Sequence, residues 1–147
     1  MKILFAASEA LPFIKVGGLG DVMGALPKEL VKQGIDARVV IPMYSVMSQK
    51  MREQCHFEKF FYFSLGWRSC YCGVFSAKAD GVTYYLIDNE QYFKRGGTYG
   101  EYDDAERFAY FSKAVLELLP QIDFFPDIIH ANDWHTALVP VYLDTQY

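Results

Sequence analysis

Two short segments hold most of the side chains in this 147-residue chain that could do chemistry. In the first, residues 15–22 (KVGGLGDV), Lys15 precedes the paired glycines Gly17 and Gly18, and Asp21 follows them. Glycines let a backbone approach a ligand closely, and a helix that begins there offers unpaired N–H groups to an anion. Together with the lysine charge, this pattern indicates a phosphate site. A tight turn that binds nothing is the alternative interpretation of the glycines.

Two well-known phosphate motifs do not describe this segment. It has no Gly-Lys-Ser/Thr sequence, so it is not a Walker A loop. The dinucleotide fingerprint needs a third glycine where this chain has Met23, and an acidic residue where the second apolar run ends in Ile41 and Pro42. We therefore expect neither a P-loop nor a nicotinamide cofactor.

The second segment, residues 130–135 (HANDWH), follows an apolar run and precedes a helical pattern. In an open α/β sheet, such junctions gather at the carboxyl edge, where ligands bind. His130, Asn132 and Asp133 would there suit the hydroxyls of a sugar. A simple helix N-cap is the alternative for Asp133, and a core position is the alternative for Trp134. His130 and His135 do not converge, so we expect no metal.

A glycine-rich loop is expected over residues 91–102, and Tyr99 lies within it between Gly97 and Gly100. Glycines and tyrosines together could form a flexible cover with an aromatic face for a sugar ring. A loop that moves freely in solvent is an equal alternative.

The element pattern predicts an α/β fold in one domain, residues 1–147. We expect a Rossmann-like, open, mostly parallel sheet with helices on both faces. Residues 57–88 differ, because aromatic and β-branched residues alternate there around an Asp80-Gly81 turn; this pattern predicts an inserted antiparallel region whose last strand rejoins the main sheet. Parallel strands are expected over 2–7, 36–41 and 126–131, the last of them buried, and helices over 20–33, 103–119 and from 133 towards 143.

Composition narrows the class of protein. A net charge of −4 disfavours nucleic acid and anionic membranes as partners. The three cysteines, Cys55, Cys70 and Cys72, lack zinc spacing and are odd in number, so we expect reduced thiols, with Cys70 and Cys72 on one buried face. The apolar run at the start is too short for a signal peptide, and a cytoplasmic protein is expected.

The first segment resembles the K-x-G-G-L-x-D-V signature of bacterial glycogen synthases and plant starch synthases. Its surroundings are similar as well: residues 8–13 (SEALPF), 24–27 (GALP), 37–42 (ARVVIP), 85–89 (YLIDN) and 126–135 (PDIIHANDWH). The resemblance covers nearly the whole chain in order.

This resemblance implies a retaining glucosyltransferase of the GT-B architecture, which moves glucose from ADP-glucose to the non-reducing end of an α-1,4-glucan without a metal or cofactor. Lys15, Gly17 and Gly18 would then bind the donor phosphates. Asp21, Tyr99 and Asp133 would lie around the sugar or the acceptor. Many relatives have histidine where this chain has Asn132, which leaves the role of that position open.

The resemblance also implies that the family's V-H-N segment and the nucleotide-binding second domain would follow Tyr147. We therefore expect an N-terminal, acceptor-side part of such an enzyme, inactive alone and able to self-associate through an incomplete sheet edge. The preference for ADP- or UDP-glucose would be set mainly in the second domain.

Two further hypotheses stay open. One is another GT-B transferase, such as a sucrose or trehalose-phosphate synthase. The other is a non-catalytic glucan-binding module that uses the 17% aromatic content to stack on sugars. Exposed aromatics between residues 57 and 85 would favour the module, and burial would favour a packed core, which the alternation there predicts.

Overall fold

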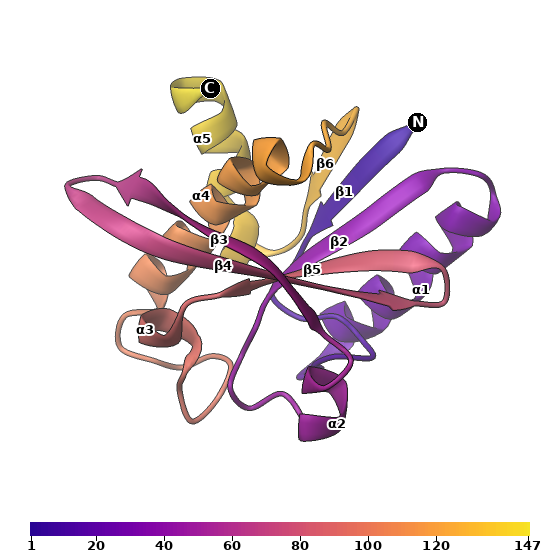
Figure 1. Cartoon of the computed structure of the whole chain (residues 1–147), viewed down its shortest axis with the longest axis horizontal. Coiled ribbons are helices and arrows are strands. Elements are labelled where there is room, and N and C mark those ends of the chain that lie inside the picture. Colours follow the sequence, from indigo (N-terminus) through magenta and orange to yellow (C-terminus); the bar gives the residue numbers. More distant parts are fainter.

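The computed structural model describes residues 1–147 as one six-stranded sheet with helices on both faces (Figure 1). The strand order is β3-β4-β5-β2-β1-β6. In chain order the elements are β1 (Lys2–Ala6), α1 (Gly18–Lys32), β2 (Asp36–Pro42), α2 (Gln49–Arg52), β3 (His56–Leu65), β4 (Arg68–Ala79), β5 (Val82–Asp88), α3 (Glu90–Phe93), α4 (Asp104–Ile122), β6 (Ile128–Ala131), the 3-10 helix η1 (Trp134–Thr136) and α5 (Leu138–Gln146).

The parallel half of the sheet is as the apolar runs predict. Strand β1 pairs in parallel with β2 and β6, and β2 pairs in parallel with β5. Helix α1 ends before Gly34, whose φ of +88° is a conformation that glycine adopts without strain. The carboxyl ends of β1, β2, β5 and β6 therefore lie along one edge of the sheet.

The antiparallel half is also confirmed. Strands β3, β4 and β5 form a meander, and Asp80 and Gly81 connect β4 to β5 with φ of +52° and +80°. Two successive positive φ values are those of the hairpin turn that an Asp-Gly pair favours. Strand β5 then lies beside β2, so the insertion rejoins the main sheet as predicted.

The core has two layers, one on each face of the sheet. Helices α3, α4 and α5 cover one face, and α1 and α2 cover the other (Figure 1). Cys70 and Cys72 are buried under α4 as free thiols, as expected. No helix is long and apolar enough to cross a membrane.

Two predicted boundaries are wrong. The loop expected over 91–102 begins with helix α3, which Asn89 caps by accepting a hydrogen bond from the Tyr92 N–H. Helix α4 continues past Pro120 and ends at Ile122, followed by the C-cap residue Asp123 with a φ of +50°. Proline lacks an N–H donor but fits a last helical turn, where the Phe124 N–H closes back onto the Leu119 carbonyl.

The C-terminal region also departs from its prediction. Strand β6 is mostly exposed rather than buried, since it pairs with β1 on one side and forms an edge of the sheet. Asp133 does not begin a continuous helix: η1 comes first, and α5 begins only at Leu138. Strand β6 and helix α5 carry exposed apolar side chains, and self-association through this part of the sheet stays a prediction: Ile128, Leu138, Val141 and Leu143.

Candidate active site

A pocket of about 350 Å³ lies where β1 and β6 end and α1 begins. It brings together residues from three regions that are far apart in the sequence. Four of the predicted site residues line it, namely Gly17, Gly18, Tyr99 and Asp133. The other lining residues are Glu9, Val16, Leu19, Trp134 and His135.

We call residues 15–20 the glycine loop. The Glu9 side chain lies against the backbone of this loop, a contact that the sequence did not predict. One carboxylate oxygen, Oε2, accepts hydrogen bonds from the N–H groups of Val16, Gly17 and Gly20 at 2.8, 2.9 and 3.1 Å. Burial alone would raise the pKa of the Glu9 carboxyl, but these bonds and one from Tyr99 lower it below its usual value. Glu9 is therefore a buried carboxylate held in its charged form.

The amides left for an external anion are those of Gly18 and Leu19. Both belong to the first turn of α1, where no backbone partner exists, and neither N–H group donates to a side chain. The Gly17 N–H, which the sequence predicts to face a phosphate, donates to Glu9 in this structure, and its contact with a donor phosphate stays a prediction. Gly17 contributes shape, whereas Gly18 and Leu19 contribute donors and the positive end of the helix dipole.

Lys15 and Asp21 lie beside the pocket rather than in its lining. Lys15 Nζ is 3.0 Å from Asp21 Oδ2, and both side chains are about half exposed. An exposed pair of this kind is weak and is easily exchanged for another partner. The Lys15 charge is therefore available to a ligand bound at the adjacent start of α1.

Asp133 has an unusual backbone conformation, with φ of +65° and ψ of −179°. This region is almost restricted to glycine and costs other residues about 1–3 kcal/mol. The predicted N-cap role is confirmed for the short helix η1, since Oδ1 accepts the Trp134 N–H at 2.7 Å. The other carboxylate oxygen has no hydrogen-bond partner and remains free for a ligand.

Three rings form the wall of the pocket opposite α1. The His135 imidazole stacks on Tyr99 and Trp134, with ring centroids 4.6 and 3.9 Å apart. Its buried nitrogens, Nδ1 and Nε2, have no hydrogen-bond partner, and burial lowers the pKa of the ring. Trp134 is half exposed rather than part of the core. A neutral imidazole beside an open indole face suits a sugar.

Two charged side chains of α4, Arg107 and Asp104, hold the loop that carries Tyr99 in place. The buried guanidinium of Arg107 donates to the carbonyls of Tyr92 and Thr98 at 2.7 and 3.1 Å and to Asp104 Oδ1 at 2.8 Å. Asp104 in turn accepts the N–H groups of Gly100 and Glu101 at 2.9 and 3.1 Å. Tyr99 is therefore presented to the pocket by a fixed loop.

The remaining two predicted residues lie outside the pocket lining. His130 packs its ring against Phe5, with centroids 5.0 Å apart. The Asn132 amide donates to the carbonyls of Ala6 and His130 at 3.1 and 3.0 Å and thereby ties the end of β6 to β1. The structure thus gives both residues a supporting place at the strand ends.

Sequence reasoning missed the roles of Glu9 and His135. Glu9 lies six residues before Lys15, and only the closure of the loop over residues 8–17 brings its carboxylate to the amides of α1. The sequence indicates His135 only as one of the polar side chains of residues 130–135, and the ring contacts with Tyr99 and Trp134 appear only in the fold. No local pattern marks either residue; their neighbours in the fold do.

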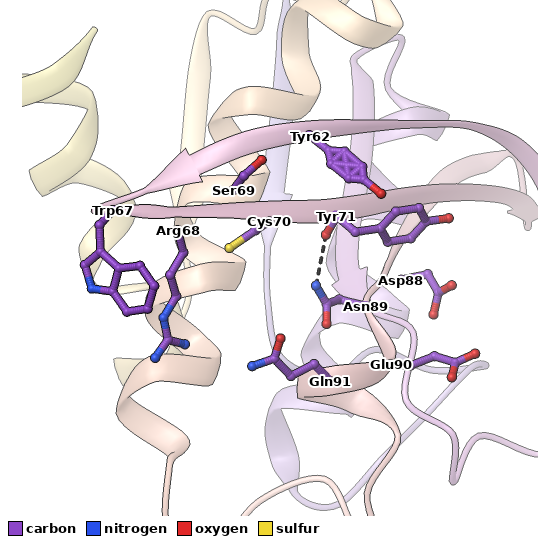
Figure 2. Close-up of a pocket in the computed structure, with 10 residues that line it drawn as sticks. All are labelled: Tyr62, Trp67, Arg68, Ser69, Cys70, Tyr71, Asp88, Asn89, Glu90 and Gln91. Carbon is purple, nitrogen blue, oxygen red and sulfur yellow. Dashed lines mark hydrogen bonds between the residues drawn. The ribbon is translucent and has the colours of Figure 1, made fainter.

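A second, larger hollow lies farther along the same sheet edge, at the ends of β4 and β5 (Figure 2). Its volume is about 820 Å³, and Trp67 and Tyr62 on its rim are 88% and 58% exposed. Tyr71 stands beside Tyr62, and its backbone carbonyl accepts a 2.9 Å hydrogen bond from Asn89. We call this hollow the aromatic groove. Its other lining residues are Arg68, Ser69, Cys70, Asp88, Glu90 and Gln91.

A family model described as starch synthase catalytic domain matches residues 2–147. The chain belongs to this family. It is 57% identical over its whole length to a glycogen synthase of Bacillus cereus (strain B4264) and 56% identical to one of Clostridium botulinum (strain Alaska E43 / Type E3). The chain covers 31% of the length of each.

A solved structure agrees with the family assignment. The chain superposes, over 99% of its length, on the catalytic domain of starch synthase IV from Arabidopsis thaliana bound to ADP and acarbose. The TM-score is 0.80 at 34% identity, and the match covers 30% of that protein. The expected GT-B-type α/β fold is thus confirmed.

Proposed function

We propose that this chain forms the acceptor-side part of the active site of a glycogen synthase, which transfers glucose from ADP-glucose to the non-reducing end of an α-1,4-glucan with retention. The observation that carries this proposal is the pocket itself. It combines two free amides at the start of α1 with Lys15 beside them and a free carboxylate oxygen on strained Asp133. Amides and lysine can stabilise the charge that develops on a departing diphosphate.

The chain covers 31% of the length of the matched glycogen synthase, which supports an active site that is shared with another part of such an enzyme. On this proposal the chain alone does not transfer glucose, because the groups that grip the nucleotide belong to a second domain. We propose the cytoplasm as its compartment, in keeping with three free cysteines. The match to the starch synthase family favours this function over a sucrose or trehalose-phosphate synthase.

A graft tests the proposal. The 147 residues replace the matching segment of the Bacillus cereus glycogen synthase, and glucose incorporation into glycogen is measured with labelled ADP-glucose. The graft is expected to be active and the isolated chain inactive. A folded graft without activity towards ADP- or UDP-glucose would contradict the proposal, provided that the parent enzyme is active in the same assay.

A second candidate function, glucan binding without catalysis, is favoured by the aromatic groove. The prediction that aromatics between 57 and 85 pack in the core holds for Phe63, Tyr84 and Tyr85 but is wrong for others. The outward-facing side chains of β3 are not covered by any helix. The exposed aromatics are Phe57, Phe60, Tyr62 and Trp67.

The chemistry of the groove suits an α-glucan. Aromatic faces stack on sugar rings, and Tyr62, Tyr71 and the Asp88 carboxylate line the groove, where the hydroxyls of a sugar can bond to them. Retention of the isolated chain on a glycogen affinity gel tests this candidate. Trp67→Ala is the variant, and Tyr102→Ala, also highly exposed but outside the groove, is the control. Equal retention of the wild type and both variants would exclude the aromatic groove as a glucan-binding site.

A further inference from the structure

The glycine loop and the Tyr99 loop meet at one side chain. Glu9 Oε2 accepts three backbone N–H groups of the glycine loop, and Glu9 Oε1 accepts the Tyr99 hydroxyl at 2.8 Å. Ser8 Oγ lies 2.7 Å from the same hydroxyl and donates to it. One carboxylate therefore joins the glycine loop to Tyr99, which lies 90 positions after Glu9 in the sequence.

The fit around Glu9 is tight. A Cβ atom at Gly20 would lie 2.9 Å from Glu9 Oε2 and 3.1 Å from the Lys15 side chain. The side chain is almost fully buried at 3% exposure. Four hydrogen bonds from the chain itself already engage the carboxylate, three on Oε2 and one on Oε1, so these contacts hold Glu9 in place.

We propose that Glu9 is a positioning residue that fixes the glycine loop and Tyr99 relative to each other. The incoming phosphate and the sugar are then bound by one preorganised unit, with Gly18 and Leu19 as the amides that face the phosphate. This inference deepens the proposed function and rests on it. It predicts that the length of the Glu9 side chain is essential for holding the two loops together and that its negative charge is not.

Two conservative substitutions separate side-chain length from charge. Glu9→Gln keeps the length: its oxygen can accept the three loop amides, and its NH₂ can donate to Tyr99, whose hydroxyl then turns to Ser8. Glu9→Asp keeps the charge but is one methylene shorter, so it cannot span both loops. A misplacement of about 1 Å in a binding group can reduce catalysis by about 100-fold.

Kinetics of the graft form the first arm of the test. We expect Glu9→Asp to lower kcat/KM for ADP-glucose on the order of 100-fold and Glu9→Gln to stay within about fivefold of the parent. The matched control is Glu106→Gln, which alters a carboxylate bonded to Arg68 and Tyr92 and touches neither loop. The inference is overturned if Asp retains activity while Gln loses it, or if all three variants behave alike.

Amide hydrogen exchange in the isolated chain forms the second arm and needs no activity. Glu9→Asp is expected to speed exchange at the Gly17 and Gly20 amides about tenfold or more. Tyr99→Phe is expected to speed exchange at the same amides, although Tyr99 does not touch them. Unchanged exchange in Tyr99→Phe would overturn the coupling, whereas an inactive graft with the expected exchange pattern would overturn the proposed function alone.

Discussion

The pocket at α1 and the aromatic groove occupy the same edge of one sheet, yet they are built in opposite ways. In the pocket, hydrogen bonds hold the polar groups in place: three amides donate to Glu9, Tyr99 donates to Glu9, and Arg107 supports the loop that carries Tyr99. In the groove, Trp67 stands on a hairpin turn and is 88% exposed. Fixed polar groups indicate chemistry, whereas open aromatic faces indicate reversible binding.

Strain separates the two regions as well. Asp133, which lines the pocket, has a backbone conformation that is unfavourable for every residue except glycine. In the turn before Trp67, the positive φ of +60° falls on a glycine, Gly66. Because this conformation costs aspartate about 1–3 kcal/mol, we expect the Asp133 side chain to have a role that glycine could not fill. The comparison therefore predicts that changes in the pocket cost activity, and that changes in the groove cost only glucan retention.

The largest effect is expected for Asp133→Gly. In the graft, glucose incorporation should fall about 100- to 1,000-fold, as for the loss of a group that acts in the transition state. The free energy of unfolding should change by less than about 1 kcal/mol, because relief of strain offsets the lost cap. Asp123→Gly, at φ of +50° at the end of α4, is the control and should leave activity unchanged. Comparable loss in both variants would contradict the role of Asp133.

A second prediction concerns the space at the start of α1. Gly20→Ala should destabilise the chain by about 1–3 kcal/mol, because its Cβ would lie 2.9 Å from Glu9 Oε2. Gly18→Ala is the matched control, since nothing lies within 4 Å of a Cβ there. Urea unfolding of the isolated chain measures both. Equal stabilities would mean that the contact at Gly20 relaxes freely.

A third prediction is a pH dependence that comes from His135. Burial lowers its pKa below the usual 6.5, so the unfolded chain binds the proton first as the pH falls. Stability from this group is complete above about pH 6.5 and is lost as the pH falls towards the folded-state pKa, by at most about 1.4 kcal/mol per pH unit. His135→Phe should flatten the curve between about pH 7.5 and about pH 5.5. If the free energy of unfolding of His135→Phe depended on pH as steeply as that of the wild type, a group other than His135 would cause the dependence.

The smallest effect on stability belongs to the groove. Trp67→Ala should change the free energy of unfolding by no more than about 0.5 kcal/mol, because the side chain is almost fully exposed. A loss above about 2 kcal/mol in the same urea titration would show that Trp67 is part of the packed structure.

Much of this fold was predictable from periodicity and turn chemistry. The apolar runs at β1 and β2 and the Asp80-Gly81 turn each specify their own local structure. The pocket was predictable only in part: the sequence indicates Gly18, Tyr99 and Asp133, but not Glu9, which meets its partners through contacts 7 to 90 residues away. Exposure at β3 also escaped prediction, because alternation indicates a strand without indicating whether a helix covers its outer face.

The most direct measurement compares Lys15→Ala and Trp67→Ala in the graft, as kcat/KM for ADP-glucose with a short maltooligosaccharide acceptor. Lys15→Ala should lose about 100-fold, because it removes the charge beside the free amides, and Trp67→Ala should remain within about twofold. If Lys15→Ala kept its full rate, the glycine loop would not bind the donor phosphate, and the assignment of the pocket as the catalytic half-site would be wrong.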